Sequence, residues 1–203
     1  KCPYHPYSVL LTVLLIERFL EKLGNSDQEI SIGIVSPYRV QADLVGKILA
    51  TKFTLNDKVK ISTATVHGFQ GDECDIVICL FNAPAGLYQT TSHNLYVNNQ
   101  NLLNVAISRA RDYLILLVPD ENTRGIQHLT GINKILRLID GIKQPRVYSS
   151  EEMEMLLMNN KDYVSDHTFI TSHQLVNVYS TVPENEYEFR ISEDAVDVQI
   201  FDE

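Results

Sequence analysis

The sequence predicts an α/β fold in which a parallel β-sheet is flanked by helices and followed by a small α+β extension. Short β-branched or aliphatic runs alternate along the chain with segments of helical periodicity, as in βαβ units. One run, DIVICLF at 75–81, is apolar after its first residue, which is typical of a strand buried on both faces of a parallel sheet. The chain has 203 residues, enough for one sizeable core and a small appendix.

The individual elements follow from the spacing of the apolar residues. A first helix is predicted over 8–23, because Val9, Val13, Ile16 and Leu20 recur at helical spacing. The remaining elements of the domain are a strand at 30–36, a helix at 40–50, strands at 60–66 and 75–81, a helix at 102–110 and a strand at 113–118.

The pattern changes after residue 120. A helix is predicted over 132–139, and Ser149 with Glu152 forms a capping-box pattern before a further helix. The runs 187–191 and 196–200 alternate between polar and apolar residues and predict a β-hairpin. We therefore expect two parts, a domain at 1–125 and an extension at 126–203.

Composition excludes several classes of protein. The 17 Lys and Arg against 26 Asp and Glu give a net charge of −9, which argues against non-specific coating of duplex nucleic acid but not against a local basic cleft. The longest apolar stretch, 9–16, is too short to span a membrane, and no signal sequence opens the chain. Three cysteines without C-x-x-C spacing fit a reducing, cytoplasmic setting, and no metal-ligand pattern combines them with histidines. A start at Lys1 rather than Met predicts a piece of a longer polypeptide.

Three segments carry residues suited to ligand binding, and we expect each at the carboxyl edge of the sheet, where open α/β sheets bind ligands. In the first, SPYRVQ at 36–41, Ser36, Tyr38 and Arg39 emerge together after a strand. A hydroxyl, an aromatic ring and a guanidinium can hold a phosphate or a stacked base. The alternative is a plain strand-to-helix turn with a proline at the helix start.

The second segment, TATVHGFQGDECD, covers 63–75. Three of its polar side chains recur with a period of two at the end of a strand: Thr63, Thr65 and His67. Gly68 and Gly71 allow a ligand to approach the backbone closely. The alternative is a loop between two strands, with Glu73 and Asp75 as solvated charges.

The third segment, LLNVAISRAR, covers 102–111. Asn104, Ser108 and Arg111 are spaced to share one face of a helix, with Arg109 on its flank. A guanidinium that leaves a closely packed helix can meet a phosphate with two hydrogen bonds. The alternative is a surface helix with two solvated arginines.

In this order, the three segments resemble motifs IV, V and VI of superfamily 1 helicases, in the branch that includes the helicase of nonsense-mediated RNA decay. The family patterns are T/S-P-Y-x-x-Q, T-V-D/H-x-F-Q-G-x-E-x-D and L-N-V-A-x-T/S-R-A-R/K, and nearly every position is matched here. The resemblance covers residues 5–119. It implies the second RecA-like motor domain of an ATP-dependent helicase or translocase.

The resemblance implies a role for each matched residue. Arg109 would be the arginine finger that reaches the γ-phosphate of ATP and neutralises charge on the transferring phosphoryl group. Gln70, Gly71 and Glu73 would line the nucleotide side of the cleft between the motor domains, where Arg111 would bind the nucleotide or serve as an ion-pair partner. Single-stranded DNA or RNA would be touched by five side chains: Ser36, Tyr38, Thr63, Thr65 and His67.

One motif of such a motor is absent from the sequence. No G-x-x-x-x-G-K-[ST] loop occurs, so ATP with Mg²⁺ would be held mainly by the first RecA-like domain of the same polypeptide. We therefore expect the chain alone to hydrolyse no ATP. Two alternatives stay open: a helicase-like interaction module that has lost the motor, and an unrelated dinucleotide binder, which is disfavoured because no G-x-G-x-x-G follows a strand.

Overall fold

The computed structural model describes nine stretches of the chain, and the structural statements below concern these alone. They are residues 5–23, 29–54, 58–69, 72–82, 98–118, 129–142, 146–166, 176–180 and 187–191.

A parallel sheet of four strands forms the centre of the fold. Its strands are β1 (Ile30–Ser36), β2 (Val59–Thr65), β3 (Cys74–Leu80) and β4 (Ala110–Leu117), in the spatial order β2-β1-β3-β4. All three pairings are parallel, and β1 and β3, the two most buried strands, lie in the middle. The predicted α/β class with its RecA-like sheet is confirmed.

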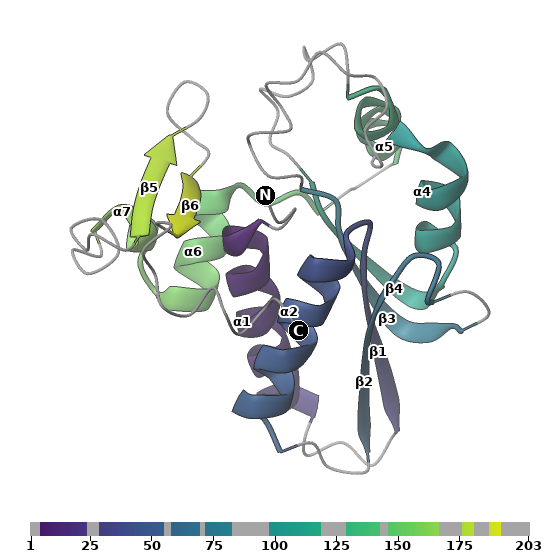
Figure 1. Cartoon of the computed structure of the whole chain (residues 1–203), viewed down its shortest axis with the longest axis horizontal. Helices are drawn as coiled ribbons and strands as arrows, with labels where there is room; N and C mark the ends of the chain where they lie inside the picture. Colours follow the sequence, from purple (N-terminus) through teal and green to yellow (C-terminus); the bar gives the residue numbers. More distant parts are fainter. Residues whose placement is uncertain are drawn as a thin grey trace.

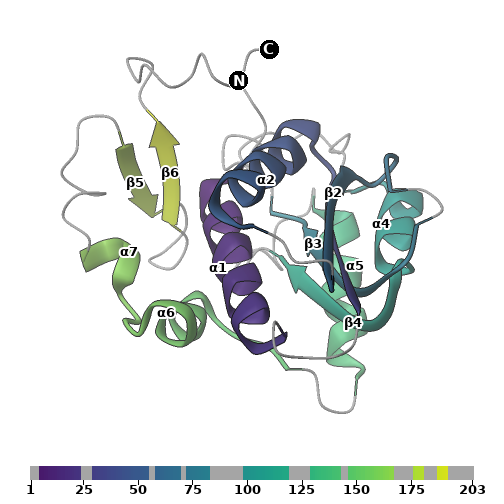
Figure 2. The ribbon, with the colours of Figure 1, turned by 90° about the horizontal axis from the view of Figure 1, so that it is seen from below.

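Helices cover both faces of this sheet. On one face lie α1 (Pro6–Leu23) and α2 (Arg39–Lys52), and on the other lie α4 (Gln100–Ile107) and α5 (Thr130–Asp140) (Figure 2). Successive residues of β1 point to opposite faces, so Ile32 and Ile34 pack under α1 and α2 whereas Val35 joins the core under α4 and α5. No helix among the described residues is both long and apolar enough to cross a membrane.

The extension after α5 begins with a helix that packs on α1. The predicted capping box starts α6 (Ser150–Met158): the Glu152 N–H donates to Ser149 Oγ, and the Ser149 N–H donates to Glu152 Oε2. Next comes α7 (Tyr163–Asp166). The carboxylate of Glu154 is buried between α6, α7 and α1, where it accepts the hydroxyl of Tyr7 at 2.8 Å and the Val164 N–H at 3.2 Å.

A two-stranded antiparallel sheet ends the described chain. It consists of β5 (Val176–Ser180) and β6 (Tyr187–Ile191), beside α1 and α6 and away from the main sheet (Figure 1). The predicted strand at 187–191 is confirmed. Its predicted hairpin partner, 196–200, lies outside the described residues, and the partner shown is β5. The predicted boundary at 125 stays a prediction. The helix α5 lies beyond that boundary and packs in the same core as α4.

The helix predicted over 102–110 ends earlier than the sequence suggests. The Asn99 side chain caps α4 by accepting the N–H groups of Asn101 and Leu102, and the helix ends at Ile107. Ala110 already pairs with Cys74 as the first residue of β4. The prediction that Arg111 shares a helix face with residues 104 and 108 is therefore wrong, because pairing with β3 overrides the helical preference of the small residues here.

The connection from β2 to β3 joins parallel strands, and its described residues, 66–69 and 72–73, form no helix. It starts at one edge of the sheet, where the Val66 N–H donates to the Ser36 carbonyl, and ends at the other, where the Cys74 N–H donates to the Arg109 carbonyl. Between these points Phe69 is 1% exposed and lies against Gly33 in the middle of β1. The chain thus returns directly across the face of the sheet.

Because the ring of Phe69 occupies the space above Gly33, we predict that Gly33→Ala destabilises the domain. A Cβ at this position would lie 2.5 Å from Phe69 Cζ. Urea unfolding should show a loss of about 1–3 kcal/mol, the usual cost of overpacking. The matched control is Gly68→Ala, whose Cβ would meet only ordinary contacts of 3.4 Å or more, with an expected change below about 0.5 kcal/mol. Equal effects of the two substitutions would contradict this packing.

Candidate functional site

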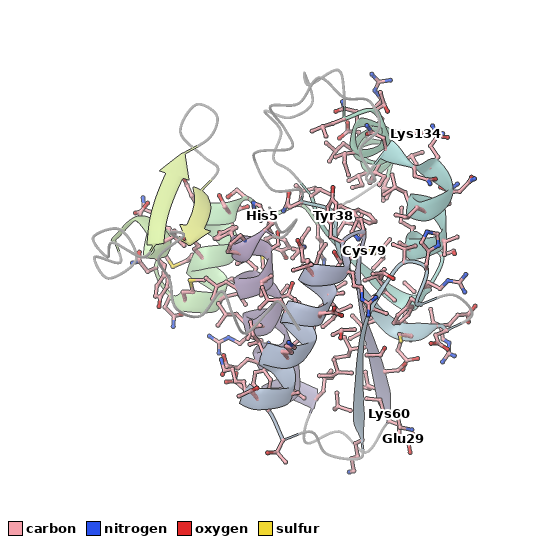
Figure 3. All side chains as sticks on the ribbon, viewed as in Figure 1. His5, Glu29, Tyr38, Lys60, Cys79 and Lys134 are labelled. Atoms are coloured by element: carbon pink, nitrogen blue, oxygen red, sulfur yellow. The ribbon has the colours of Figure 1, made fainter. Side chains whose placement is uncertain are left out.

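The candidate residues lie at two opposite edges of the sheet. Ser36 and Thr65 are the paired last residues of β1 and β2, whereas Glu73 and Arg109 immediately precede β3 and β4. Seven residues of strand separate the edges by about 20 Å. The prediction that all three segments share the carboxyl edge is wrong, because a residue that directly precedes a parallel strand lies at that strand's amino edge. Figure 3 shows His5 and Tyr38 at one edge and Glu29 and Lys60 at the other.

The hydroxyls of Ser36 and Tyr38 are both turned into the protein. Ser36 is fully buried, and its Oγ accepts the Tyr38 N–H at 3.1 Å. The Tyr38 ring packs against the core under α4 and α5, and burial raises the pKa of its hydroxyl to about 12. This arrangement therefore does not support the predicted contacts of the two hydroxyls with a single strand.

Of the other three residues predicted to touch a nucleic-acid strand, only His67 is exposed. Thr63 lies in the middle of β2 and faces α2, where a Cβ on Gly46 would be only 2.5 Å from its Oγ1. Thr65 closes the following turn, because its Oγ1 accepts the Gly68 N–H at 3.2 Å. Thr63 is thus a packing residue, and the predicted contact of His67 with a nucleic-acid strand stays a prediction.

Arg39 adds a positive charge at the same edge. Its side chain is 86% exposed, with Asp43 at 3.6 Å as its ion-pair partner within α2. It opens the first turn of α2, which has no side-chain cap and no acidic residue. A helix N-terminus and an arginine both favour an approaching phosphate.

A buried polar cluster also lies at the carboxyl edge, and the sequence analysis did not assign it. Its members come from the starts of α1 and α2 and the end of β3: His5, Ser8, Gln41 and Asn82. The His5 N–H donates to Gln41 Oε1 at 3.0 Å, and Ser8 Oγ lies 2.9 Å from His5 Nδ1 and accepts Asn82 Nδ2 at 3.0 Å. Burial lowers the pKa of His5 to about 4. The cluster holds both helices to the sheet.

The amino edge carries a group of charges around β3 and β4. Arg111 bridges two carboxylates, with its Nε 3.5 Å from Glu73 Oε2 and its Nη1 3.5 Å from Asp75 Oδ1. The side chains of Arg111 and Glu73 are both half exposed. Of the two predicted roles for Arg111, the structure shows the ion-pair partner.

Arg109 lies beside this group but is held differently. Its carbonyl accepts the Cys74 N–H at 3.0 Å, which places it next to the residue that follows Glu73. Its Nε donates to the Val105 carbonyl at 3.2 Å, at the end of α4. The side chain is half-buried, and within the described stretches nothing accepts a hydrogen bond from its two terminal nitrogens. The terminal nitrogens of this guanidinium can therefore donate hydrogen bonds to an anionic ligand.

Two predicted residues, Gln70 and Gly71, lie outside the described residues. Within the described part of the chain, no group of three or more His, Cys, Asp or Glu residues is arranged to hold a metal ion.

Comparison with known proteins identifies the family. The sequence profile of a family described as an AAA domain matches residues 7–121, more than half of the chain. The chain shares 30% identity over 137 residues with the "Probable RNA helicase armi" of Drosophila melanogaster. It shares 28% over 106 residues with the "DNA polymerase alpha-associated DNA helicase A" of Saccharomyces cerevisiae. The chain belongs to this AAA-domain family, which its helicase relatives share. It is a C-terminal domain of a superfamily 1 helicase, of the nonsense-mediated-decay branch.

The similarity to these helicases covers their shared domain. The alignments with the fly and budding-yeast proteins take in 66% and 52% of the chain but only 11% and 14% of the relatives. A third relative, "Helicase sen1" of Schizosaccharomyces pombe, is 29% identical over 115 residues, which is 56% of the chain and 6% of that protein. The chain thus spans a small part of each curated relative.

The buried, neutral state of His5 predicts a loss of stability in acid. The unfolded chain takes up a proton near the ordinary pKa of 6.5, and the folded domain does so only near 4. The stability is fully present above pH 6.5 and falls by up to about 3 kcal/mol as the pH drops to 4. The substitution His5→Asn should remove this part of the pH dependence when urea unfolding is compared at pH 7.5 and 4.5. An equal loss in both proteins would contradict a neutral buried imidazole.

Proposed function

We propose that this helicase domain is the second motor domain of an ATP-dependent helicase or translocase, and that Arg109 is its arginine finger. The observation that carries the proposal is the outer guanidinium of Arg109, which is without a partner among the described residues and lies at the same edge as Glu73. A guanidinium held by its Nε and backbone, with no partner for its terminal nitrogens among the described residues, suits a group that must stabilise developing negative charge.

The nucleotide would be shared with a second domain. The chain contains no G-x-x-x-x-G-K-[ST] loop, so ATP and Mg²⁺ would be held mainly by the first RecA-like domain. The bound triphosphate supplies the phosphoryl group that is transferred to water. From the amino edge of β3 and β4, this chain would direct Arg109 to the γ-phosphate and the carboxylate of Glu73 to the ribose.

Nucleic acid would lie at the opposite edge. Arg39, His67 and the uncapped start of α2 supply the exposed positive or polar groups there. A chain of net charge −9 favours such a local set of contacts over a broad basic surface. The connection from His67 through Phe69 to Glu73 would link the nucleic-acid edge to the nucleotide edge. Because the relatives' names include both a DNA and an RNA helicase, the proposal covers single strands of either kind.

The domain alone should hydrolyse no ATP, because the phosphate-binding loop is missing from it. In the polypeptide that carries both motor domains, Arg109→Ala should lower kcat about 10³-fold with little change in KM, as removal of an arginine finger does. Steady-state ATP hydrolysis with and without single-stranded nucleic acid measures this. The matched control is Arg18→Ala, an exposed arginine paired with Glu21 on α1. Turnover by the isolated domain, or full activity of the Arg109 variant, would refute the proposal and favour an interaction module.

Arg39→Gln should weaken binding of single-stranded oligonucleotides of any sequence. If Arg39 contacts one phosphate, the slope of log affinity against log salt should fall by about one, since one fewer counterion is released. Fluorescence anisotropy over a salt series measures it. Arg137→Gln, an exposed arginine at the end of α5, is the control. An unchanged slope for Arg39→Gln would place the nucleic acid elsewhere.

A further inference from the structure

Two arginines of one motif, Arg109 and Arg111, lie two positions apart and are used differently. Arg109 directs its Nε to a backbone carbonyl and keeps its terminal nitrogens without a partner among the described residues. Arg111 directs its Nε to Glu73 and its Nη1 to Asp75. The sequence pattern cannot distinguish the two, but their contacts can.

The carboxylate of Asp75, which binds Arg111, is itself held in place by hydrogen bonds from Ser31. Its Oδ2 accepts both the N–H and the hydroxyl of Ser31, at 2.8 and 2.7 Å, and the Asp75 N–H donates back to Ser31 Oγ at 3.0 Å. These bonds join the start of β3 to the start of β1. Hydrogen bonds from the Ser31 backbone and then from its hydroxyl lower the pKa of Asp75, so this carboxylate stays charged near neutral pH. Its other oxygen, Oδ1, is left to Arg111.

An irregularity in β4 brings Arg111 to this carboxylate. Cys74 pairs with Ala110 and Ile76 pairs with Tyr113, so β4 has one more residue than β3 in this interval. The extra residue is a β-bulge, which breaks the regular alternation of side chains and re-aims them. Arg111 lies in the bulge and reaches both the anchored Asp75 and the residue before β3, Glu73.

Glu73 depends on Arg111 for its position. Glu73 lies just before β3, and its side chain is half exposed. In the described part of the chain, Arg111 is its one ion-pair or hydrogen-bond partner. Because Arg111 is itself held by Asp75, the order of support runs from Ser31 to Asp75, to Arg111 and then to Glu73. Glu73 is thereby kept beside the turn that carries Arg109.

We propose that Arg111 is a positioning residue, which holds Glu73 in place for the nucleotide through its bridge to Asp75 and does not itself touch the nucleotide. This inference rests on the proposed function, in which Arg109 and Glu73 face ATP. It assigns the two arginines separate tasks: Arg109 acts on the phosphoryl group, and Arg111 acts through Glu73.

The test compares ATP turnover of single and double variants in the polypeptide that carries both motor domains. Arg111→Gln should raise KM for ATP about threefold, which corresponds to the free energy of one exposed ion pair. It should change kcat less than about twofold. Glu73→Gln should raise KM at least as much. Because Arg111 acts through Glu73, the double variant should be no worse than Glu73→Gln alone. Arg111→Lys keeps one of the two contacts and should restore part of the affinity, and Arg18→Gln is the matched control for loss of a surface ion pair.

Three outcomes would overturn the inference. The first is a loss of kcat in Arg111→Gln as large as that in Arg109→Ala. The second is a KM in the double variant that is raised by the product of the effects of Arg111→Gln and Glu73→Gln. The third is an unchanged KM in Arg111→Gln. Failure of the proposed function has a different result, because Arg109→Ala would then leave turnover unchanged. The Arg109 variant measured in parallel thus separates the two failures.

Discussion

The arrangement of the whole domain depends on the short connection between β2 and β3. A crossover between parallel strands usually contains a helix, but here eight residues return across the face of the sheet. The return is possible because Phe69 packs onto Gly33, where β1 has no side chain to obstruct the ring. The connection runs from His67 at the carboxyl edge to Glu73 at the amino edge. A bulkier β1 would push this segment off the sheet and separate both ends from their neighbours.

The two edges that result differ in their chemistry. At the carboxyl edge, a neutral buried cluster around His5 fixes the starts of α1 and α2, and the exposed charge of Arg39 lies above it. At the amino edge, Asp75 anchors Arg111, while the terminal nitrogens of Arg109 have no partner among the described residues. In the proposed motor, the first edge would meet a single strand and the second a triphosphate. Coupling of the two ligands would need a connection between these edges that transmits a displacement.

The sequence predicted the order of the elements well, because β-branched runs and helical periodicity are local properties. It also identified the three motifs, since residue type and spacing are sufficient for a resemblance. It failed where the outcome depends on pairing between distant segments. The end of α4 at Ile107 is decided by the pairing of Ala110 with Cys74, and the inward turn of Ser36 is decided by the backbone of the next helix. The ion pair of Arg111 lies at a register shift between β3 and β4, which the spacing of a single strand does not reveal.

The most direct test of the central claim is a crystal structure of both motor domains with a transition-state analogue of ATP hydrolysis and a single-stranded oligonucleotide. The account predicts the guanidinium of Arg109 within hydrogen-bonding distance of the phosphoryl mimic, with Glu73 beside the ribose, and the oligonucleotide at the opposite edge near Arg39. A phosphoryl mimic at the carboxyl edge of β1 and β2, or an Arg109 side chain directed away from it, would contradict the account.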